Sequence, residues 1–204
     1  MVAPPDPFAV ANALGLVAFG AAGALKGAEA DLDPFGVVVL GLLTAFGGGA
    51  LRDVLVGRTP ASLLTTGDVT FAFVGVAVAV VLSLSGVAGR DHPALALADS
   101  VGLAAFAATG ALVGVDAGVS PFGVVLLATL TGVGGGSLSD LLLTRVPVVL
   151  REDFYATPAL AGGVALLAVR AANVAPPAPT ATCVGVTLAL RLAAIRYDWS
   201  LPSL

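Results

Sequence analysis

Apolar residues occur along the chain in long stretches, separated by short charged or proline-rich segments. Each stretch has about 20 residues, the length that an α-helix needs to cross a bilayer, and such stretches are too long for buried strands. We therefore predict an all-α polytopic membrane protein with seven transmembrane helices. The predicted spans are Phe8–Gly27, Pro34–Gly57, Val69–Gly89, Ala94–Val115, Ser120–Thr144, Ala156–Val174 and Ala178–Tyr197.

The chain contains an internal repeat with an offset of 87 residues. Phe19–Pro60 aligns with Phe106–Pro147 without a gap, with glycines, aspartate, arginine and proline in register. Such self-similarity indicates a duplicated structural unit. Because each unit holds three spans, the second copy must lie inverted in the membrane relative to the first, as in many transport proteins. We predict one transmembrane domain over residues 1–204, with repeat 1 at about 8–89, repeat 2 at about 94–174 and a seventh helix at about 178–197.

The composition excludes several classes of function. Of the 204 residues 58% are hydrophobic and 11% are charged, and this charged fraction is about half that of a soluble domain. The net charge of −4 and the lack of any basic run argue against a nucleic-acid partner. The sequence has a single histidine, a single cysteine and no glycine-rich phosphate loop followed by lysine. We therefore predict no enzyme activity, no metal site and no cofactor.

The distribution of basic residues predicts the orientation in the cell membrane, because cytoplasmic loops are enriched in lysine and arginine. One side would hold six basic residues and the other three, so the first side is predicted to be cytoplasmic. This places the N-terminus outside and the C-terminus in the cytoplasm. The first side comprises Lys26, Arg90, Arg145, Arg151, Arg191 and Arg196, and the second comprises Arg52, Arg58 and Arg170.

Two triple-glycine runs lie at matching positions, in the second span of each repeat. Three consecutive glycines cost about 1 kcal/mol each in a helix interior relative to alanine. We therefore predict that helices 2 and 5 are broken there and that the bare backbone lines an ion pathway, since broken helices in both halves are typical of permeation sites. The alternative is that the glycines allow close helix packing. The predicted pathway residues are Gly47, Gly48, Gly49, Gly134, Gly135 and Gly136, with the hydroxyls of Thr44, Thr131, Ser137 and Ser139.

An aspartate follows each glycine run by four residues, at Asp53 and Asp140. Ionisable residues within spans are costly and usually face a partner or a water-filled route. Both aspartates have arginines nearby, which leaves two interpretations open: direct contact with a permeant ion, or a structural salt bridge across the pseudo-symmetry axis. The two roles can coexist, because a pair that breaks can act as a gate. The residues predicted for gating or salt bridges are Arg52, Asp53, Arg58, Asp140 and Arg145.

These motifs resemble a known family. The segment Phe46–Pro60, FGGGALRDVLVGRTP, and its second copy, GGGSLSD followed by Arg145 and Pro147, are similar to the signature of the prokaryotic trimeric intracellular cation (TRIC) channel family. The resemblance implies a homotrimer with one pore inside each protomer. It also implies that helices 2 and 5 bend at the glycine runs and line this pore, that the permeant ion is K⁺ or Na⁺, and that membrane lipids surround the assembly.

Two functions are compatible with this resemblance. The first is a passive K⁺-permeable channel. The second is a secondary transporter of a small amino acid such as glycine, because some bacterial relatives of similar architecture have been linked to glycine uptake. A structural scaffold would leave the paired glycine runs unexplained. If the glycines line the pore, replacing Gly48 and Gly135 together with leucine should lower permeation more than it lowers trimer yield.

Overall fold

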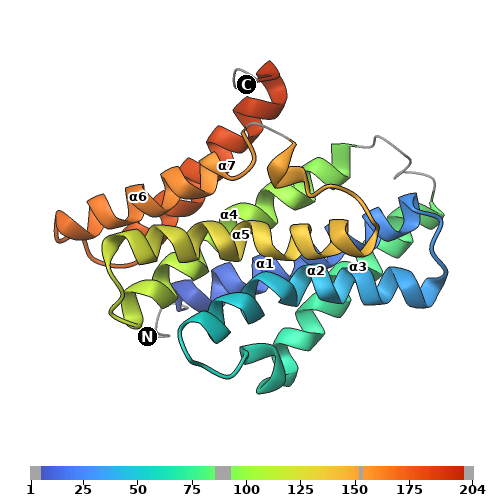
Figure 1. Cartoon of the computed structure of the whole chain (residues 1–204), viewed down its shortest axis with the longest axis horizontal. Coiled ribbons are helices and arrows are strands. Elements are labelled where there is room, and N and C mark those ends of the chain that lie inside the picture. Colours follow the sequence, from blue (N-terminus) through green and yellow to red (C-terminus); the bar gives the residue numbers. More distant parts are fainter. Residues whose placement is uncertain (1–5, 86–92, 152–153, 200–204) are drawn as a thin grey trace, which may run out of the picture.

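The computed structural model describes residues 6–85, 93–151 and 154–199. Within these residues the protein consists of α-helices and two short 3₁₀ helices (Figure 1). The first repeat contains α1 (Pro7–Glu29), α2 (Pro34–Leu55), η1 (Ala61–Leu63) and α3 (Thr66–Leu84). The second contains α4 (Pro93–Asp116), α5 (Pro121–Leu142), η2 (Val148–Leu150) and α6 (Thr157–Ala171), and α7 (Ala178–Tyr197) follows it.

The inverted repeat is visible in the directions of the helices. In Figure 1, α1 and α4 run in opposite directions through the molecule, as do α2 and α5. The helix starts are built alike, because Asp33 caps α2 through the Gly36 amide at 2.7 Å and Ser120 caps α5 through the Gly123 amide at 3.2 Å. A proline occupies the first turn of both helices, where its missing N–H is not needed.

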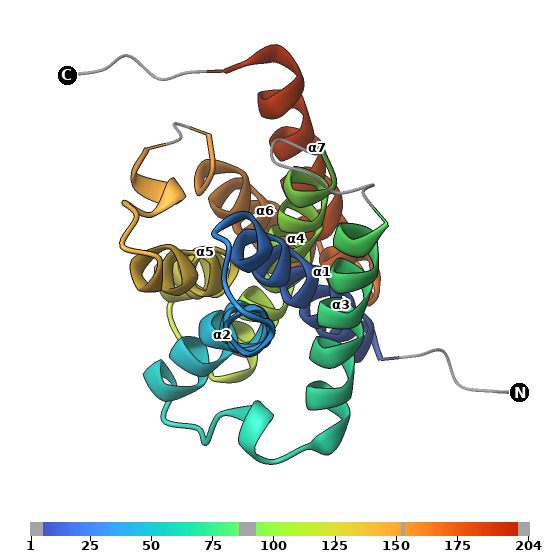
Figure 2. The same cartoon turned by 90° about the vertical axis from the view of Figure 1, so that its right-hand side faces the viewer.

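The two helices α1 and α4 form the centre of the bundle, with the other helices around them (Figure 2). Their contact is centred on Phe19 and Phe106, which occupy equivalent positions in the two repeats and lie edge to face with ring centroids 5.2 Å apart. Gly15 and Gly102 face these rings, and a Cβ at either position would overlap the opposing phenylalanine. The core of the bundle is therefore itself built around the pseudo-two-fold axis.

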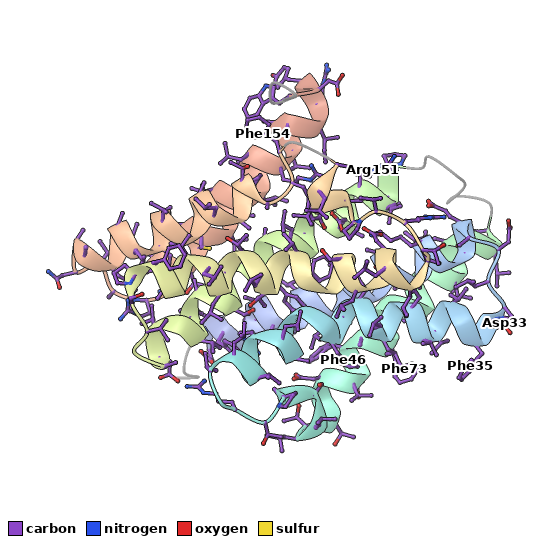
Figure 3. All side chains as sticks on the ribbon, in the orientation of Figure 1. Asp33, Phe35, Phe46, Phe73, Arg151 and Phe154 are labelled. Atoms are coloured by element: carbon purple, nitrogen blue, oxygen red, sulfur yellow. The ribbon has the colours of Figure 1, made fainter. Side chains whose placement is uncertain are left out.

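The outer surface is strongly apolar, as a bilayer requires. Phe35 and Phe122 occupy equivalent positions near the starts of α2 and α5, and each is 76% exposed. Figure 3 shows Phe35 and Phe73 pointing away from the bundle. Water does not accommodate so many large apolar groups on one surface, so these faces contact lipid or another protomer.

One prediction about the helices needs correction. The helices α2 and α5 are continuous α-helices through both glycine runs, so the predicted break is wrong. All seven predicted helices are present; among the described residues six of them are long and apolar enough to cross a membrane, and α6 is a shorter apolar helix. With 15 residues, α6 is only about 22 Å long at about 1.5 Å per residue. The buried turn at Tyr155 precedes the start of α6, and Asn173, which has a left-handed φ of 57°, follows its end.

Candidate functional site

The glycine runs are the place where α2 and α5 cross. A Cβ on Gly48 would overlap the carbonyl oxygen of Thr131, and a Cβ on Gly135 would overlap the carbonyl oxygen of Thr44. These two contacts are related by the 87-residue offset. Only glycine allows the two backbones to approach so closely, and this is how small residues usually act between membrane helices. In this structure the glycines make packing contacts, and their role in an ion pathway stays a prediction.

The threonines before the glycine runs are fully buried. Thr44 Oγ1 donates to the carbonyl of Leu40 at 2.7 Å, and Thr131 Oγ1 donates to the carbonyl of Leu127 at 2.6 Å. Ser137 and Ser139 also donate to carbonyls of their own helix. All four hydroxyls are thus satisfied by local back-bonding, which is common for such residues within helices.

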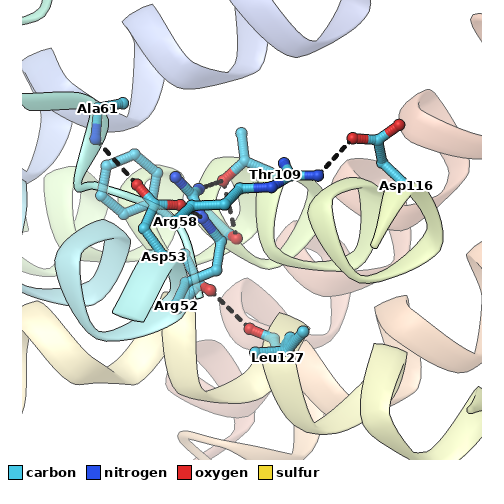
Figure 4. A network of polar contacts seen from close by, with 9 residues as sticks. Arg52, Asp53, Arg58, Ala61, Thr109, Asp116 and Leu127 are labelled. Carbon is cyan, nitrogen blue, oxygen red and sulfur yellow. Dashed lines mark hydrogen bonds and ion pairs between the residues drawn. The ribbon is translucent and has the colours of Figure 1, made fainter. Parts of the chain in front are cut away.

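Asp53 lies at one end of the crossing and has both carboxylate oxygens engaged (Figure 4). Its Oδ1 accepts from Arg52 Nε at 2.8 Å, and its Oδ2 accepts from the backbone amide of Ala61 at 3.0 Å. Arg52 Nη1 also donates to Thr109 Oγ1 in α4 at 3.4 Å. Arg52 and Asp53 are both buried, and the hydrogen bond from Arg52 to Thr109 connects this ion pair to the second repeat inside the protein.

Asp140 lies at the opposite end and repeats half of this arrangement. Its Oδ2 accepts from the amide of Val148 at 3.0 Å, and Val148 is the equivalent of Ala61. Its Oδ1, however, accepts from Lys26 Nζ of α1 at 2.8 Å. The duplication therefore preserved the carboxylate and its backbone donor, whereas the cation comes from a different helix in each half. Both predicted aspartates are in ion pairs, and Asp140 pairs with Lys26 rather than with Arg145.

Arg58, which was also predicted for gating or salt bridges, forms an exposed ion pair. Its Nη2 is 2.6 Å from Asp116 Oδ2, and the two side chains are 42% and 74% exposed. Arg145, the equivalent of Arg58, is exposed at the other end of the bundle. Neither arginine is buried as Arg52 is, so these two residues do not belong to the internal ion pairs.

We expect little effect from breaking the exposed pair. Asp116→Asn should change the free energy of unfolding by less than about 1 kcal/mol, because solvent and salt screen exposed charges. Thermal unfolding at low and at high KCl measures this difference, which should shrink further as salt rises. A loss that persists in high salt would mean that the pair is shielded in the assembled protein.

Two further polar contacts were missed by the sequence analysis. Asn12 Nδ2 donates to Asp68 Oδ1 at 3.0 Å, and Tyr155 Oη donates to Asp99 Oδ1 at 2.9 Å. Position 99 is the equivalent of position 12, and position 155 is the equivalent of position 68. Both repeats therefore have a hydrogen bond between these positions, but the donor is an amide in the first repeat and a phenol in the second. Extending the 87-residue offset beyond the aligned segment shows from sequence that the four positions are equivalent in pairs, whereas the structure was needed to show that the residues of each repeat meet.

Tyr155 connects the Asp140 end to α7. Burial and the neighbouring Asp99 carboxylate raise the pKa of Tyr155 well above its ordinary value of 10, so its phenol keeps the proton that it donates. The guanidinium of Arg191 lies 4.7 Å from the centre of its ring, and Arg191 Nη1 donates to the carbonyl of Phe154 at 3.2 Å. The charge of Arg191 within the seventh span is thus held against an aromatic ring.

A cavity adjoins each internal ion pair. The cavity at the Asp140 end has a volume of about 380 Å³ and is lined by Lys26, Asp140 and Arg145, among others. The cavity at the Asp53 end has about 20 Å³ and is lined by Gly49 and Asp53, among others. No residue lines both cavities. The larger cavity can hold several waters, whereas the smaller one has room for about one, which needs roughly 10–15 Å³.

The two ends also divide the basic residues as predicted. Lys26, Arg145 and Arg151 line the cavity at the Asp140 end, whereas Arg58 and Arg170 line a third cavity at the Asp53 end. Arg90 lies outside the described residues. Which end faces the cytoplasm remains the prediction made from the count of basic residues.

These features define a class: a multi-pass membrane protein of two inverted three-helix repeats with a buried ion pair at each end of the central crossing. A family model described as Glycine transporter matches the chain twice, at residues 9–84 and 96–171, one match for each repeat. The UPF0126 inner membrane protein YadS of Escherichia coli is 36% identical, covering 93% of this chain and 92% of the relative. A UPF0126 membrane protein of Deinococcus radiodurans is 44% identical, covering 73% and 70%.

Solved structures are similar over almost the whole chain. The TRIC orthologue of Rhodobacter sphaeroides is 30% identical with a TM-score of 0.84, covering 94% of this chain and 98% of that one. A second structure, solved to explain conductance through TRIC cation channels, is 32% identical with a TM-score of 0.83, and the match covers 97% of both chains. The TRIC channel of C. elegans, at 18% identity and a TM-score of 0.60, shares the fold. The chain therefore belongs to the Glycine transporter family and is a prokaryotic member of the TRIC channel family.

Proposed function

We propose that this protein is a K⁺-permeable cation channel that assembles as a homotrimer, with a pathway in each protomer along the α2–α5 crossing. The observation that carries the proposal is the pair of equivalent carboxylates, Asp53 and Asp140. They lie at opposite ends of one crossing, and each is buried, adjoins a cavity and faces a cation. The relatives of known structure are described as cation channels, which supports the same function.

In this proposal, a permeating cation takes the place of the protein's own cation beside each carboxylate. The amides of Ala61 and Val148 hold one oxygen of each aspartate, and the other oxygen becomes available when Arg52 or Lys26 moves away. A mobile cation is stabilised next to a fixed carboxylate in the low dielectric of a bundle interior. Separation of α2 from α5 at the glycines would then bring the backbone and the adjacent hydroxyls into contact with the ion.

The arrangement described above corresponds to the closed pathway in this proposal. Both carboxylates are occupied by protein cations, and the Asp53 cavity of about 20 Å³ has room for one water. A hydrated K⁺ needs more space than this. The Asp53 end is therefore the narrower of the two ends, and we propose that opening requires the pair of Arg52 and Asp53 to move.

A second function, transport of a small amino acid such as glycine, is favoured by one feature of the Asp140 end. Lys26 and Asp140 present one positive and one negative group beside a cavity of about 380 Å³. A zwitterion could place its carboxylate on Lys26 and its ammonium on Asp140. The description of the matching family model names this same substrate.

Planar-bilayer recording of the purified protein under a KCl gradient separates the two functions. We expect discrete unitary currents that reverse near the K⁺ potential and that do not change when glycine is added to one side. A silent bilayer, together with saturable glycine uptake into proteoliposomes, would overturn the channel proposal. The Asp116→Asn variant is the control, because its exposed charge lies outside the proposed pathway.

A further inference from the structure

The largest of the three cavities described here is separate from both internal ion pairs. It has a volume of about 600 Å³, within the range of roughly 300–1,000 Å³ that ligand pockets occupy. It lies where α1 and α7 begin and where α4 and α6 end. Because α1, α4 and α7 are long and apolar enough to cross a membrane and the cavity lies at their ends, we expect its mouth at the depth of the lipid headgroups. The proposed ion pathway makes no use of it.

The residues that line this cavity are of two kinds, apolar and charged. Phe8 and Leu112, with neighbouring valines of α4, provide an apolar wall. Four charged residues from four different segments also line the cavity: Asp6, Arg58, Asp116 and Arg170. Apolar surface with a few convergent polar groups is typical of a binding site for an amphiphile.

The charges at the mouth are balanced and only partly paired. Arg58 uses one nitrogen on Asp116, so its guanidinium keeps other donors. Arg170 lies in the last turn of α6, and its side chain makes no ion pair or hydrogen bond with any other described residue. Asp6 caps α1 through the Phe8 amide with one oxygen, which leaves the other oxygen available. The mouth therefore offers two positive and two negative groups with zero net formal charge.

We propose that this cavity binds one phospholipid whose headgroup carries both a phosphate and a primary ammonium, as phosphatidylethanolamine does. The phosphate lies against Arg170 and Arg58, the ammonium lies against Asp6 and Asp116, and an acyl chain lies along Phe8 and Leu112. Arginine binds phosphate oxygens through its fork of N–H donors. An ammonium offers three N–H donors to the carboxylates.

Charge balance distinguishes this lipid from the common alternatives. A phosphatidylglycerol headgroup would satisfy the arginines but would place its net negative charge beside both aspartates. A phosphatidylcholine headgroup has no N–H donor for the carboxylates. We therefore expect the cavity to select the zwitterionic headgroup with a primary ammonium over both of these lipids.

The test is native mass spectrometry of the delipidated full-length protein, in its assembled state, after incubation with equal amounts of the three lipids. We expect one retained phosphatidylethanolamine per protomer and much less of the other two. Arg170→Gln should weaken this retention about tenfold, as expected for loss of one charge-assisted hydrogen bond. Arg151→Gln is the matched control, because Arg151 is also an exposed arginine but lines the cavity at the Asp140 end.

Soluble phosphoethanolamine serves as a competitor and tests the role of the acyl chain. It should displace the lipid only weakly, because it lacks the chain that contacts the apolar wall. Equal retention of phosphatidylglycerol, unchanged retention in Arg170→Gln, or full displacement by phosphoethanolamine would each overturn the proposal. Absence of any retained lipid from the wild-type assembly would also overturn it.

Discussion

Gly48→Ala is expected to destabilise the folded protein by about 1–3 kcal/mol, the usual cost of inserting an extra methyl group into a well-packed interior. The added Cβ would overlap the carbonyl oxygen of Thr131, which is backbone and cannot turn away as a side chain can. Gly135→Ala should behave alike, because its Cβ would overlap the carbonyl oxygen of Thr44. Thermal unfolding of the purified protein, together with the yield of assembled trimer, measures both effects.

The same glycine run supplies the control. At Gly49, an added Cβ would meet Arg52 Nη2 at an ordinary contact distance of 3.7 Å, and no other atom of the described residues beyond its own helix backbone lies within 4 Å. Gly49→Ala should therefore be neutral or stabilising by up to about 1 kcal/mol, since alanine favours the helix that the structure shows here.

The structure also revises the expectation for the double leucine variant at positions 48 and 135. A leucine at either position cannot fit while α2 and α5 stay in contact, so trimer yield and current should fall together. Suppose instead that Gly48→Ala unfolded at the wild-type midpoint but lost its current. The crossing of α2 and α5 would then have to open readily, because it would have accepted the added methyl group without loss of stability. The glycines would then act directly in the pathway.

The second large effect is expected at the ion pair of Lys26 and Asp140. Asp140→Asn should cost about 3–5 kcal/mol, because it leaves the ammonium of Lys26 buried without a countercharge. Lys26→Met should have a similar cost, because it leaves the Asp140 carboxylate uncompensated. The double variant should be much less destabilised than the sum of the two single variants, since it removes both buried charges at once.

Unfolding midpoints of the four proteins form a double-mutant cycle that measures this coupling. The exposed pair of Arg58 and Asp116 is the matched control, for which we expect a coupling below about 1 kcal/mol. Additive effects at Lys26 and Asp140 would contradict the buried pair. In bilayers, the folded double variant should conduct with altered K⁺ current if Lys26 blocks the Asp140 end, and with wild-type current if the pair is only structural.

Much of the architecture could be predicted because it depends on local patterns and on self-similarity. The offset of 87 residues identified the duplicated unit, and the odd number of spans in it required the inversion that Figure 1 shows. The same offset placed Asp53 and Asp140 at equivalent points, and both occupy buried ion pairs. It also makes positions 12 and 99, and positions 68 and 155, equivalent, so a contact known in one repeat predicts its counterpart in the other.

Other features depended on which helices meet in space. Helix propensity alone predicted a break at three glycines, but the crossing of α2 and α5 supplies packing that keeps both helices continuous. The partner of Asp140 could not be read from its neighbours, because Lys26 precedes it by 114 residues and its equivalent in the second repeat is a valine.

The sequence by itself determined the spans, the duplication, the inversion and the two carboxylates, because hydropathy and repeats are properties of the chain. The tertiary structure alone decided the identity of each carboxylate's cation, the continuity of the glycine helices and the size of the cavity at each end. These features arise where side chains from distant segments compete for one buried charge or one contact surface, and the folded packing determines which of them is close enough to bind.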